Sequence, residues 1–347
     1  MGATISWFAE IDLADRAQVG GKGGSLGELT RAGIPVPAGF VVRTEAFEHF
    51  LMQLERSAPV RTRVAALAGD DLAAIEACSA ELRELIERTP LPQATAAAIN
   101  HAHATLMQHG AFPVAVRSSA TTEDASDASF AGQQDTYLYV MSADECVDRV
   151  RSCWASLYSI ESISYRRRRN FPEAGVAMAV VVQTMVDART AGVMFTRSPT
   201  SGDRSVITIE GAWGLGSAVV SGEVTPDRWV IGKVTGEITV RTISDKTTEH
   251  LPATNGGVES AAVPGERRRA ASLSDAELEA LRQLARRIER HYGTAQDIEW
   301  AIDRHSGEIR VLQSRPETVW SSKDAAPVAS ASSNPLLHVM NIFGGRR

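Results

Sequence analysis

Residues 296–315 read QDIEWAIDRHSGEIRVLQSR. Apolar and polar side chains alternate over the first eight residues and again over the last seven, which is the period of a β-strand with one buried face. The five residues between these runs include Gly307, and a link of this length and composition predicts a hairpin turn. We therefore predict two antiparallel strands, in a register that pairs Asp303 with Ile309.

Two carboxylates share one face of the first predicted strand, because Asp297 and Glu299 are two residues apart. The predicted register brings two further polar side chains to that face, with Gln313 opposite Glu299 and Arg315 opposite Asp297. Carboxylate oxygens suit Mg²⁺, which leaves its other positions to phosphate oxygens and water, and arginine can bind a phosphate bidentately. The residues alone equally allow a solvated strand face with cross-strand ion pairs.

The chain outside this hairpin mixes helical and strand signals. Residues 274–292 predict a helix, since Ser274 and Glu277 form a capping box and Gly293 follows as a stop. Several further segments give coarser signals. They are a helical block over 44–108 with a break at 89–92, a helix over 144–165 followed by the basic run 166–169, and buried strands at 112–116, 176–185 and 192–196. The mixture predicts the α+β class.

Two polar stretches near the N-terminus and the middle of the chain indicate anion binding. Lys22 lies between two glycine pairs in a predicted loop, where backbone amides and an ammonium group can approach an anion. The GxxxxGK[ST] order of a Walker A loop is absent. A second predicted loop, 117–136, begins with Arg117 and is rich in hydroxyl groups. A flexible surface loop explains each stretch equally well when it is taken alone.

A glycine-rich run at 211–217 superficially suggests dinucleotide binding, but GxGxxG does not occur. The acidic residue expected about 20 positions further on is also missing, so a nicotinamide-dependent dehydrogenase is rejected.

The composition is that of a globular domain, with 347 residues, 44% hydrophobic residues and a formal net charge of −6. The negative charge disfavours nucleic acid and anionic membrane surfaces as partners. No apolar run is long enough to span a bilayer, and no secretory signal is visible. The cysteines at 78, 146 and 153 lack metal-ligand spacing and are expected to be reduced and packed. We therefore expect a cytoplasmic protein.

Nine motifs together give the chain a specific resemblance. In order they are Val19-Gly20-Gly21-Lys22 with Ser25-Leu26-Gly27-Glu28, Ile34-Pro35-Val36-Pro37 with Gly39-Phe40, Val116-Arg117-Ser118-Ser119-Ala120 with Glu123-Asp124, Phe130-Ala131-Gly132-Gln133, Gly192-Val193-Met194-Phe195-Thr196, Gly214-Leu215-Gly216, Ser221-Gly222-Glu223-Val224, Gln296-Asp297-Ile298-Glu299-Trp300, and Gln313-Ser314-Arg315-Pro316. Over residues 5–320 the chain resembles the N-terminal nucleotide-binding domain of the phosphoenolpyruvate synthase, pyruvate phosphate dikinase and rifampin phosphotransferase family.

This resemblance implies an ATP-grasp fold, in which two α+β lobes close on the nucleotide. The first lobe with its helical block would span 1–190, the second 191–320, and a linker or tail 321–347. The family's site residues carry over to positions of this sequence, with ATP and Mg²⁺ as the implied cofactors. Lys22, Arg117 and Arg315 would bind phosphates and act in catalysis, Gly132 and Thr136 would belong to the covering loop, Gln183 would face the adenine, Asp297 and Glu299 would bind Mg²⁺, and Gln313 would complete the phosphate site.

In this family a histidine on a separate swivelling domain attacks the β-phosphate of ATP, which yields phosphohistidine, AMP and phosphate. The phosphoryl group then passes to a small-molecule acceptor such as pyruvate, phenol or an antibiotic. None of the eight histidines here lies in the family's Ser/Thr-His-Ala context. The implied partner is therefore a histidine-bearing phosphocarrier domain or subunit.

Three interpretations of the missing histidine stay open at this point. The chain can be a separate ATP-binding subunit, as in the phenylphosphate synthases, or an excised domain of a longer enzyme. It can also be a nucleotide-binding sensor without turnover, although the retained charged residues argue against this. One departure from the family pattern concerns Ser217, which follows Gly214-Leu215-Gly216 where the family often has an acidic residue. Glu223 is near in sequence and could substitute for that acid.

Overall fold

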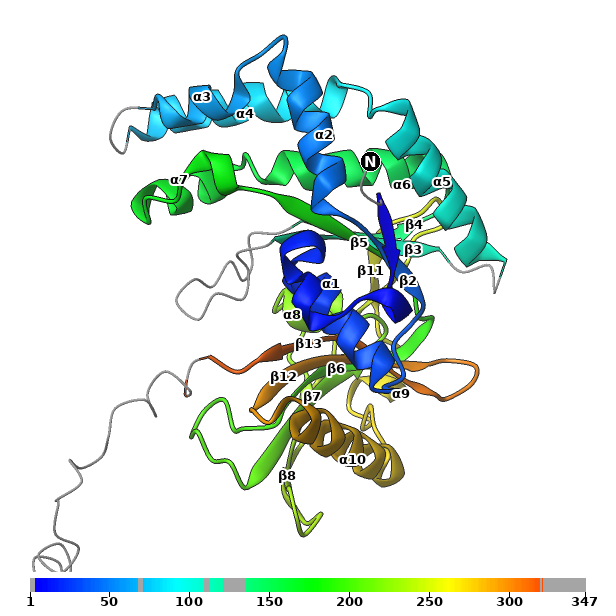
Figure 1. The fold of residues 1–347 in the computed structure, drawn as a ribbon. Coiled ribbons are helices and arrows are strands. Elements are labelled where there is room, and N and C mark those ends of the chain that lie inside the picture. The colour runs from blue at the N-terminus through cyan, green and yellow to red at the C-terminus, as the bar shows by residue number, and fades with distance from the viewer. Residues whose placement is uncertain (1–3, 68–70, 109–112, 121–134, 319, 321–347) are drawn as a thin grey trace, which may run out of the picture.

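The computed structural model describes residues 4–67, 71–108, 113–120, 135–318 and 320. Two large antiparallel sheets lie one above the other, with a long helix between them (Figure 1). Strands up to Thr184 belong to the first sheet, and strands from Ala188 onward belong to the second sheet or to a separate two-stranded one. The predicted α+β class with two lobes is confirmed, while the exact limits 1–190 and 191–320 remain predictions. The predicted tail, 321–347, lies outside the described residues.

The first lobe is built on a five-stranded sheet in the order β1-β2-β5-β3-β4. Its strands are β1 (Ile5–Trp7), β2 (Gly39–Val42), β3 (Val114–Ala120), β4 (Thr136–Val140) and β5 (Met178–Thr184). One face packs against the helical block, drawn at the top of Figure 1. The block consists of α2 (Thr44–Glu55), α3 (Val60–Ala65), α4 (Leu72–Arg88), α5 (Gln93–Met107), α6 (Ala143–Ser156) and α7 (Ile160–Arg168). The other face is turned toward the second lobe.

The second lobe is built on a six-stranded sheet in the order β13-β12-β6-β7-β8-β9. Its strands are β6 (Ala188–Phe195), β7 (Val206–Trp213), β8 (Asp227–Gly232), β9 (Ile238–Thr242), β12 (Gln296–Asp303) and β13 (Ile309–Pro316). A separate pair, β10 (Thr248–Pro252) and β11 (Val258–Ala262), and the short helices α8 (Ser217–Val220) and α9 (Gly265–Arg268) complete the lobe. The helix α10 (Asp275–Tyr292) covers the lower face of the sheet in Figure 1.

The long helix α10 confirms the strongest sequence prediction. Its N-cap Ser274 accepts a hydrogen bond from the backbone of Glu277, whose side chain returns to the Ser274 backbone, and Gly293 ends the helix with a φ of 71°. The apolar stripe of α10, which includes Leu281 and Ile288, lies in the core of the second lobe. The helix therefore belongs to the scaffold that holds the sheet from behind.

The helix between the lobes, α1 (Arg16–Arg31), packs against both of them. Val19 and Leu26 lie in an apolar cluster with the first sheet, whereas Leu29 lies in the core of the second lobe. Short 3₁₀ turns at Phe8–Glu10, Leu13–Asp15 and Glu173–Gly175 complete the described elements. Because α1 shares its buried surface between the two cores, it is the main packed connection of the lobes.

Residues 20–24, predicted as a loop, lie within α1 instead. The helix is interrupted at Gly20, whose φ of 70° and ψ of 176° belong to a backbone region that glycine alone adopts readily. A Cβ at this position would lie 2.2 Å from the carbonyl oxygen of Ser119. Gly20 is therefore explained by a close approach of the helix to β3, which a local sequence pattern cannot show.

Two other element predictions need correction. The residues from Arg117 to Ala120, predicted to start a loop, are the buried second half of β3, and residues 121–134 lie outside the described part of the chain. The single helix predicted over 144–165 is two helices, because the hydroxyl of Ser159 accepts a hydrogen bond from Ser162 and starts α7. The break at 89–92 is confirmed between α4 and α5.

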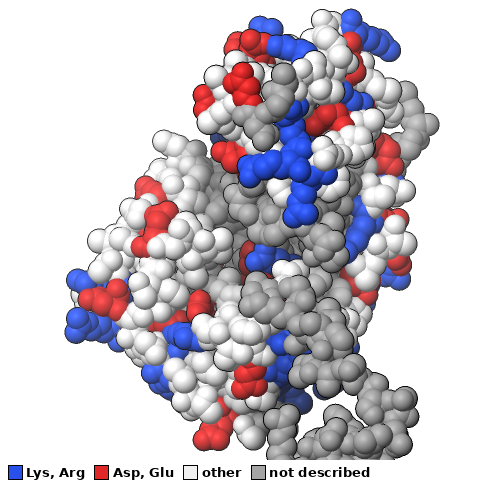
Figure 2. All heavy atoms as spheres, turned by 90° about the vertical axis from the view of Figure 1, so that its left-hand side faces the viewer, with Lys and Arg blue, Asp and Glu red and all other residues white. Residues whose placement is uncertain are grey.

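The basic run at the end of α7 is only partly exposed. Arg166 is 3% exposed, donates to the carbonyl of Leu157 and forms an ion pair with Glu173, while Arg168 and Arg169 face solvent. Figure 2 shows basic side chains gathered on the upper part of one face of the molecule. The first arginine is therefore a structural residue of the first lobe.

The three cysteines are unpaired and buried, as predicted. Burial raises the pKa of the Cys146 thiol to about 12, so this thiol is not ionised at neutral pH. Within the described ranges, no helix combines the length and the hydropathy needed to cross a membrane.

Candidate nucleotide and metal site

The hairpin β12–β13 turns its polar face toward the first lobe. Asp297 pairs with Arg315 and Glu299 with Gln313, as predicted. The hairpin is apolar on its opposite face, where Trp300 of β12 lies in the core of the second lobe together with residues of α10. The two carboxylates therefore project from strands whose opposite face is packed into this core.

The predicted register is correct at this end of the hairpin and wrong at the turn. Ile302, not Asp303, pairs with Ile309, and a β-bulge shifts the register between Glu299 and Trp300. Trp300 pairs with Val311 and Glu299 with Gln313, so Leu312 is the extra residue. Because of this residue, Val311 can point into the core while Gln313, two positions later, points to the opposite face.

Arg117 of the first lobe binds this bulge. Its guanidinium donates to the backbone carbonyl of Leu312 at 3.0 Å, to the Gln313 amide oxygen at 2.6 Å and to a Glu299 carboxylate oxygen at 3.1 Å. Its Nε is buried and has no hydrogen-bond partner in the part of the chain that the structure describes. Three of the predicted site residues thus meet in one network across the two lobes.

Asp297 is the more perturbed of the two acids. Burial raises its pKa to about 6, the ion pair with Arg315 at 3.4 Å opposes the rise, and Glu317 adds to it. A nearby cation favours the charged form of a carboxyl group and lowers its pKa. The negative charge of ionised Asp297 is therefore only partly balanced by the charged groups of the protein.

The donor set at this face suits Mg²⁺. It consists of the carboxylates of Asp297 and Glu299 and the amide oxygen of Gln313, all oxygen ligands. Across the described residues, no group of three or more His, Cys, Asp and Glu side chains is placed to hold a metal ion. Two carboxylates are nevertheless what Mg²⁺ takes when phosphates and water fill the rest of its coordination sphere.

Lys22, the predicted phosphate-binding lysine, lies on α1 next to β3. It lies in the first turn after the interruption at Gly20 and is 9% exposed. The hydroxyl of Ser119 accepts a hydrogen bond from the Gly23 amide at 3.2 Å and donates to the Val19 carbonyl at 2.9 Å. This hydroxyl fixes the helical turn of Lys22 against β3, the strand of Arg117.

Thr136 and Gln183 lie on the same face of the first sheet as Arg117. Arg117 pairs with Thr136 on β4, and Gln183 pairs with Ala115, two positions from Arg117 on β3. The Gln183 side chain is 3% exposed, and its Nε2 has no hydrogen-bond partner among the described residues. A buried amide donor of this kind is expected to meet a ligand or water. The last predicted site residue, Gly132, lies outside the described residues.

Two features of this face were missed by sequence reasoning. The first is the carbonyl of Leu312, which a bulge alone makes available. The second is Glu210 on β7, which shares a cross-sheet row with Glu299 through Val193 and forms an ion pair with Arg228 at 3.7 Å. A single glutamate within the apolar strand Val206–Trp213 was the signal that could have indicated it.

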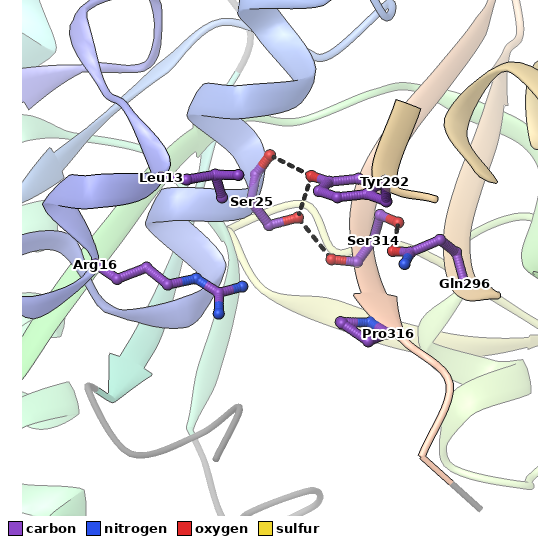
Figure 3. Close-up of a pocket in the computed structure, with 7 residues that line it drawn as sticks. All are labelled: Leu13, Arg16, Ser25, Tyr292, Gln296, Ser314 and Pro316. Atoms are coloured by element: carbon purple, nitrogen blue, oxygen red, sulfur yellow. Dashed lines mark hydrogen bonds between the residues drawn. The ribbon is translucent and has the colours of Figure 1, made fainter. Parts of the chain in front are cut away.

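A cavity of about 240 Å³ lies on the reverse side of the hairpin, between α1 and the second lobe (Figure 3). It is lined by Leu13, Arg16, Ser25, Tyr292, Gln296, Ser314 and Pro316. The Ser25 hydroxyl donates to the Ser314 carbonyl at 2.6 Å, and the Ser314 hydroxyl donates to Gln296 at 2.9 Å. This lining shares no residue with the predicted site, so the cavity marks the seam between α1 and the hairpin.

Comparisons with known proteins agree with the motifs. Residues 16–334 match the family model described as pyruvate phosphate dikinase, AMP/ATP-binding domain. A probable phosphoenolpyruvate synthase of Methanothermobacter thermautotrophicus is 43% identical over 317 residues, which are 90% of this chain and 46% of that protein. A rifampicin phosphotransferase of a Streptomyces species is 42% identical over 318 residues, which are 91% of this chain and 36% of that protein.

The phosphoenolpyruvate synthase of Pyrococcus furiosus is 37% identical over 366 residues, covering 94% of this chain and 45% of that protein. The D-alanyl-alanine synthetase A of Vibrio cholerae gives a TM-score of 0.27 at 12% identity, over 70% of this chain and 54% of that chain, a likeness too slight to support an argument. This chain spans less than half the length of the three sequence relatives. By its sequence over residues 16–334, the chain belongs to the AMP/ATP-binding domain family of pyruvate phosphate dikinase.

Proposed function

We propose that the chain is the Mg²⁺-dependent ATP-binding component of a dikinase-type phosphotransferase. It would cleave ATP to AMP and phosphate by transfer to a histidine on another domain or subunit. The observation that supports this most is the network of Arg117, which joins the first lobe to Glu299 and Gln313 of the second. The family match and the named activities of the relatives support the reaction class.

Each group of site residues would contact a different part of the nucleotide. Gln183, with its unpaired buried amide, would contact the adenine, and Thr136 with Gly132 would line the phosphates. Lys22, Arg117 and Arg315 would carry positive charge to the phosphate oxygens. Transfer of a phosphoryl group needs positioning and charge stabilisation more than covalent help. Two cations on buried backbone, Lys22 and Arg117, with the more exposed Arg315 opposite them on the hairpin, are suited to the task.

The carboxylates of Asp297 and Glu299 would hold Mg²⁺, with Gln313 beside them. The ion would supply charge neutralisation at the phosphate oxygens when bound. Without a bound ligand, Arg117 forms an ion pair with the Glu299 carboxylate. On binding of the metal and nucleotide, we expect this guanidinium to exchange its carboxylate partner for a phosphate oxygen.

The chemical step requires a nucleophile from outside the described residues. A histidine nitrogen of the partner would attack the β-phosphorus, AMP would leave, and loss of phosphate would give phosphohistidine. The partner would then pass the phosphoryl group to a small-molecule acceptor, for which pyruvate, phenol and an antibiotic are the candidate classes. Phosphoenolpyruvate synthase and rifampicin phosphotransferase among the relatives support two of these classes.

The position of the transferred phosphorus gives a direct test. The chain is mixed with extract fractions of its source and with ATP labelled with ³²P at either the β or the γ position. We expect Mg²⁺-dependent, acid-labile label in a second polypeptide from the β-labelled ATP, with AMP as the product. Label transfer from the γ position alone would indicate an ordinary kinase and contradict the proposal.

Calorimetry with the purified chain tests the binding step separately. We expect ATP to bind with Mg²⁺ present and binding to weaken without it. Tight ATP binding with no AMP formed in any fraction would favour the alternative function, a nucleotide-binding regulatory or sensor protein without turnover. Absence of ATP binding would overturn both.

A further inference from the structure

Three side chains outside the nucleotide site form a continuous hydrogen-bonded chain. The Ser217 hydroxyl lies 2.8 Å from Nδ1 of His250, and Nε2 of the same ring lies 2.9 Å from a carboxylate oxygen of Glu223. Ser217 begins α8 directly after the turn that follows β7, while His250 comes from β10. A serine, a histidine and an acid thus converge from three separate segments.

The chemistry of the three groups fixes the direction of the two hydrogen bonds. The hydrogen bond from His250 holds the pKa of the Glu223 carboxyl below its usual value, so Glu223 is a carboxylate and can only accept. With a neutral ring, Nε2 therefore carries the proton and Nδ1 is the acceptor. The Ser217 hydroxyl must then donate to Nδ1, which directs its proton at a base.

The backbone around His250 holds this chain in place. The amide of Leu215 donates to the His250 carbonyl at 3.0 Å, and Gly214 forms an isolated bridge with His250. A Cβ on Gly214, whose φ is 71°, would lie 2.4 Å from the same carbonyl oxygen. The strand β10 is therefore fastened to the turn that precedes Ser217, and the ring cannot drift from the hydroxyl without breaking these contacts.

The chain opens to solvent rather than lying inside the lobe. The Glu223 side chain is 55% exposed, and Ser217 is half-buried. The fully buried pair of Lys246 and Asp227 in the same lobe shows the contrast, since both of its side chains are 0% exposed.

An apolar side chain lies beside the serine. Val220 is 64% exposed and follows Ser217 by three residues on α8, so the two project to neighbouring positions of the helix surface. Beyond them, Gly222 has open space around a built Cβ. The surroundings of the hydroxyl thus offer an exposed apolar contact, which suits the acyl part of an ester better than a charged group.

We propose that Ser217, His250 and Glu223 form a second reactive site, in which Ser217 is a nucleophile toward carboxylic esters. The Ser217 oxygen forms a bond to the ester carbonyl carbon while its proton passes to His250 Nδ1. The alcohol leaves with that proton, and the serine becomes acylated. Water then attacks the acyl-serine by the same route, which releases the carboxylic acid and restores the hydroxyl.

A fluorophosphonate probe tests the nucleophile without turnover. Attack by Ser217 forms an oxygen–phosphorus bond and expels fluoride, which leaves a stable adduct that peptide mass spectrometry locates. We expect labelling at residue 217 in the wild-type chain, none there in Ser217→Ala, and a rate at least about 100-fold lower in His250→Gln, as for loss of a general base. Hydrolysis of p-nitrophenyl acetate is expected to fall in parallel.

Ser306→Ala is the control, because its exposed hydroxyl donates to Asp303 in the turn between β12 and β13, away from Ser217, His250 and Glu223. It is expected to label like wild type. An unlabelled wild-type chain, label at another serine, or an unchanged rate in His250→Gln would each overturn the proposal.

His250 is buried, so its variant can fail to fold, which its thermal unfolding curve reveals. In that case Glu223→Gln decides, because Glu223 is exposed: a reduced rate supports the proposal and an unchanged rate overturns it. ATP binding measured on the same preparations keeps this result separate from the proposed nucleotide function, whose residues are different.

Discussion

The two halves of the candidate nucleotide site are built in opposite ways. In the second lobe, Asp297, Glu299 and Arg315 project from a hairpin whose reverse face is an apolar core. In the first lobe, Lys22 and Arg117 emerge from elements that are buried on every side and that touch each other through backbone atoms. The second-lobe side chains therefore project from an already packed hairpin. The first-lobe side chains belong to elements whose packing depends on the same segments that carry the binding groups.

This difference predicts how each half responds to mutation. Substitutions on the hairpin face should change the chemistry and leave the fold intact. Substitutions around α1 and β3 should change both together, because the same contacts place the ligands and stabilise the lobe. The following variants test that separation, in order of decreasing expected effect.

Gly20→Ala should have the largest effect. The left-handed backbone conformation at Gly20 is strained for alanine, and the new Cβ would lie 2.2 Å from the Ser119 carbonyl oxygen. We expect a loss of at least about 3 kcal/mol in unfolding free energy, together with a loss of ATP affinity. Urea denaturation and calorimetry measure the two quantities.

Gly222→Ala is the control for this variant, because its φ of 75° is similar but a Cβ there meets nothing within 4 Å. It should cost about 1–2 kcal/mol from backbone strain alone and leave ATP affinity unchanged. Equal losses in the two variants would show that the contact with Ser119 is not what holds α1.

Glu299→Gln should separate chemistry from stability. The amide keeps the shape and can still accept from Arg117, but it removes a charged oxygen from the proposed metal site. We expect Mg²⁺-dependent AMP formation to fall by about 10²-fold or more, which corresponds to roughly 2.7 kcal/mol, with unfolding free energy changed by less than about 1 kcal/mol. The assay uses β-labelled ATP with the active extract fraction.

Glu308→Gln, in the turn of the same hairpin and paired only with Arg310 among the contacts found, is the matched control and should retain full activity. A large stability loss in Glu299→Gln would contradict the separation between the two halves.

Ser119→Ala should have an intermediate effect on stability. It removes the hydroxyl that joins the Gly23 amide to the Val19 carbonyl and leaves both buried groups without that partner. We expect a loss of about 2 kcal/mol in unfolding free energy and a measurable loss of ATP affinity. Ser205→Ala, which removes an exposed hydroxyl bonded to Asp203 in its own turn, should change neither quantity.

Ser25→Ala should have the smallest effect of the series. Its hydroxyl on α1 donates to the Ser314 carbonyl on the hairpin at 2.6 Å and also lies 3.3 Å from the Tyr292 hydroxyl, so it joins the two halves. We expect a loss of about 1 kcal/mol in unfolding free energy. Ser57→Ala removes a comparable bond to a carbonyl within α2's own end and should cost less. The reverse order would indicate that the seam adds nothing to stability.

The same contrast explains what could be predicted from the sequence. The hairpin was predictable because strand alternation is local, and the pairs of Asp297 with Arg315 and Glu299 with Gln313 follow from it. The helix α10 was predictable for the same reason, since its cap and stop residues lie within its own sequence. Each of these features depends on neighbours only a few residues away.

The first-lobe half was not predictable by pattern. The glycines around Lys22 gave the signal of a loop, because the contact that requires Gly20 involves Ser119, about a hundred residues later. Arg117 gave the signal of a loop because a polar stretch hid a buried strand, whose charged group is satisfied by β13. The role of Lys22 and Arg117 came from the family resemblance, and the relatives support the family while leaving each residue's role to experiment.

The bulge at Leu312 has a consequence for how this segment can change in evolution. The bulge changes the alternation of side chains along β13. Val311, before the bulge, points into the core, and Gln313, after it, points toward the candidate site. Deletion of this one residue would make Val311 and Gln313 neighbours, which still places them on opposite faces, but it would remove the carbonyl that accepts from Arg117. The site uses the backbone of residue 312 and not its side chain, so alignments of related sequences should tolerate many residues at 312 but no gap.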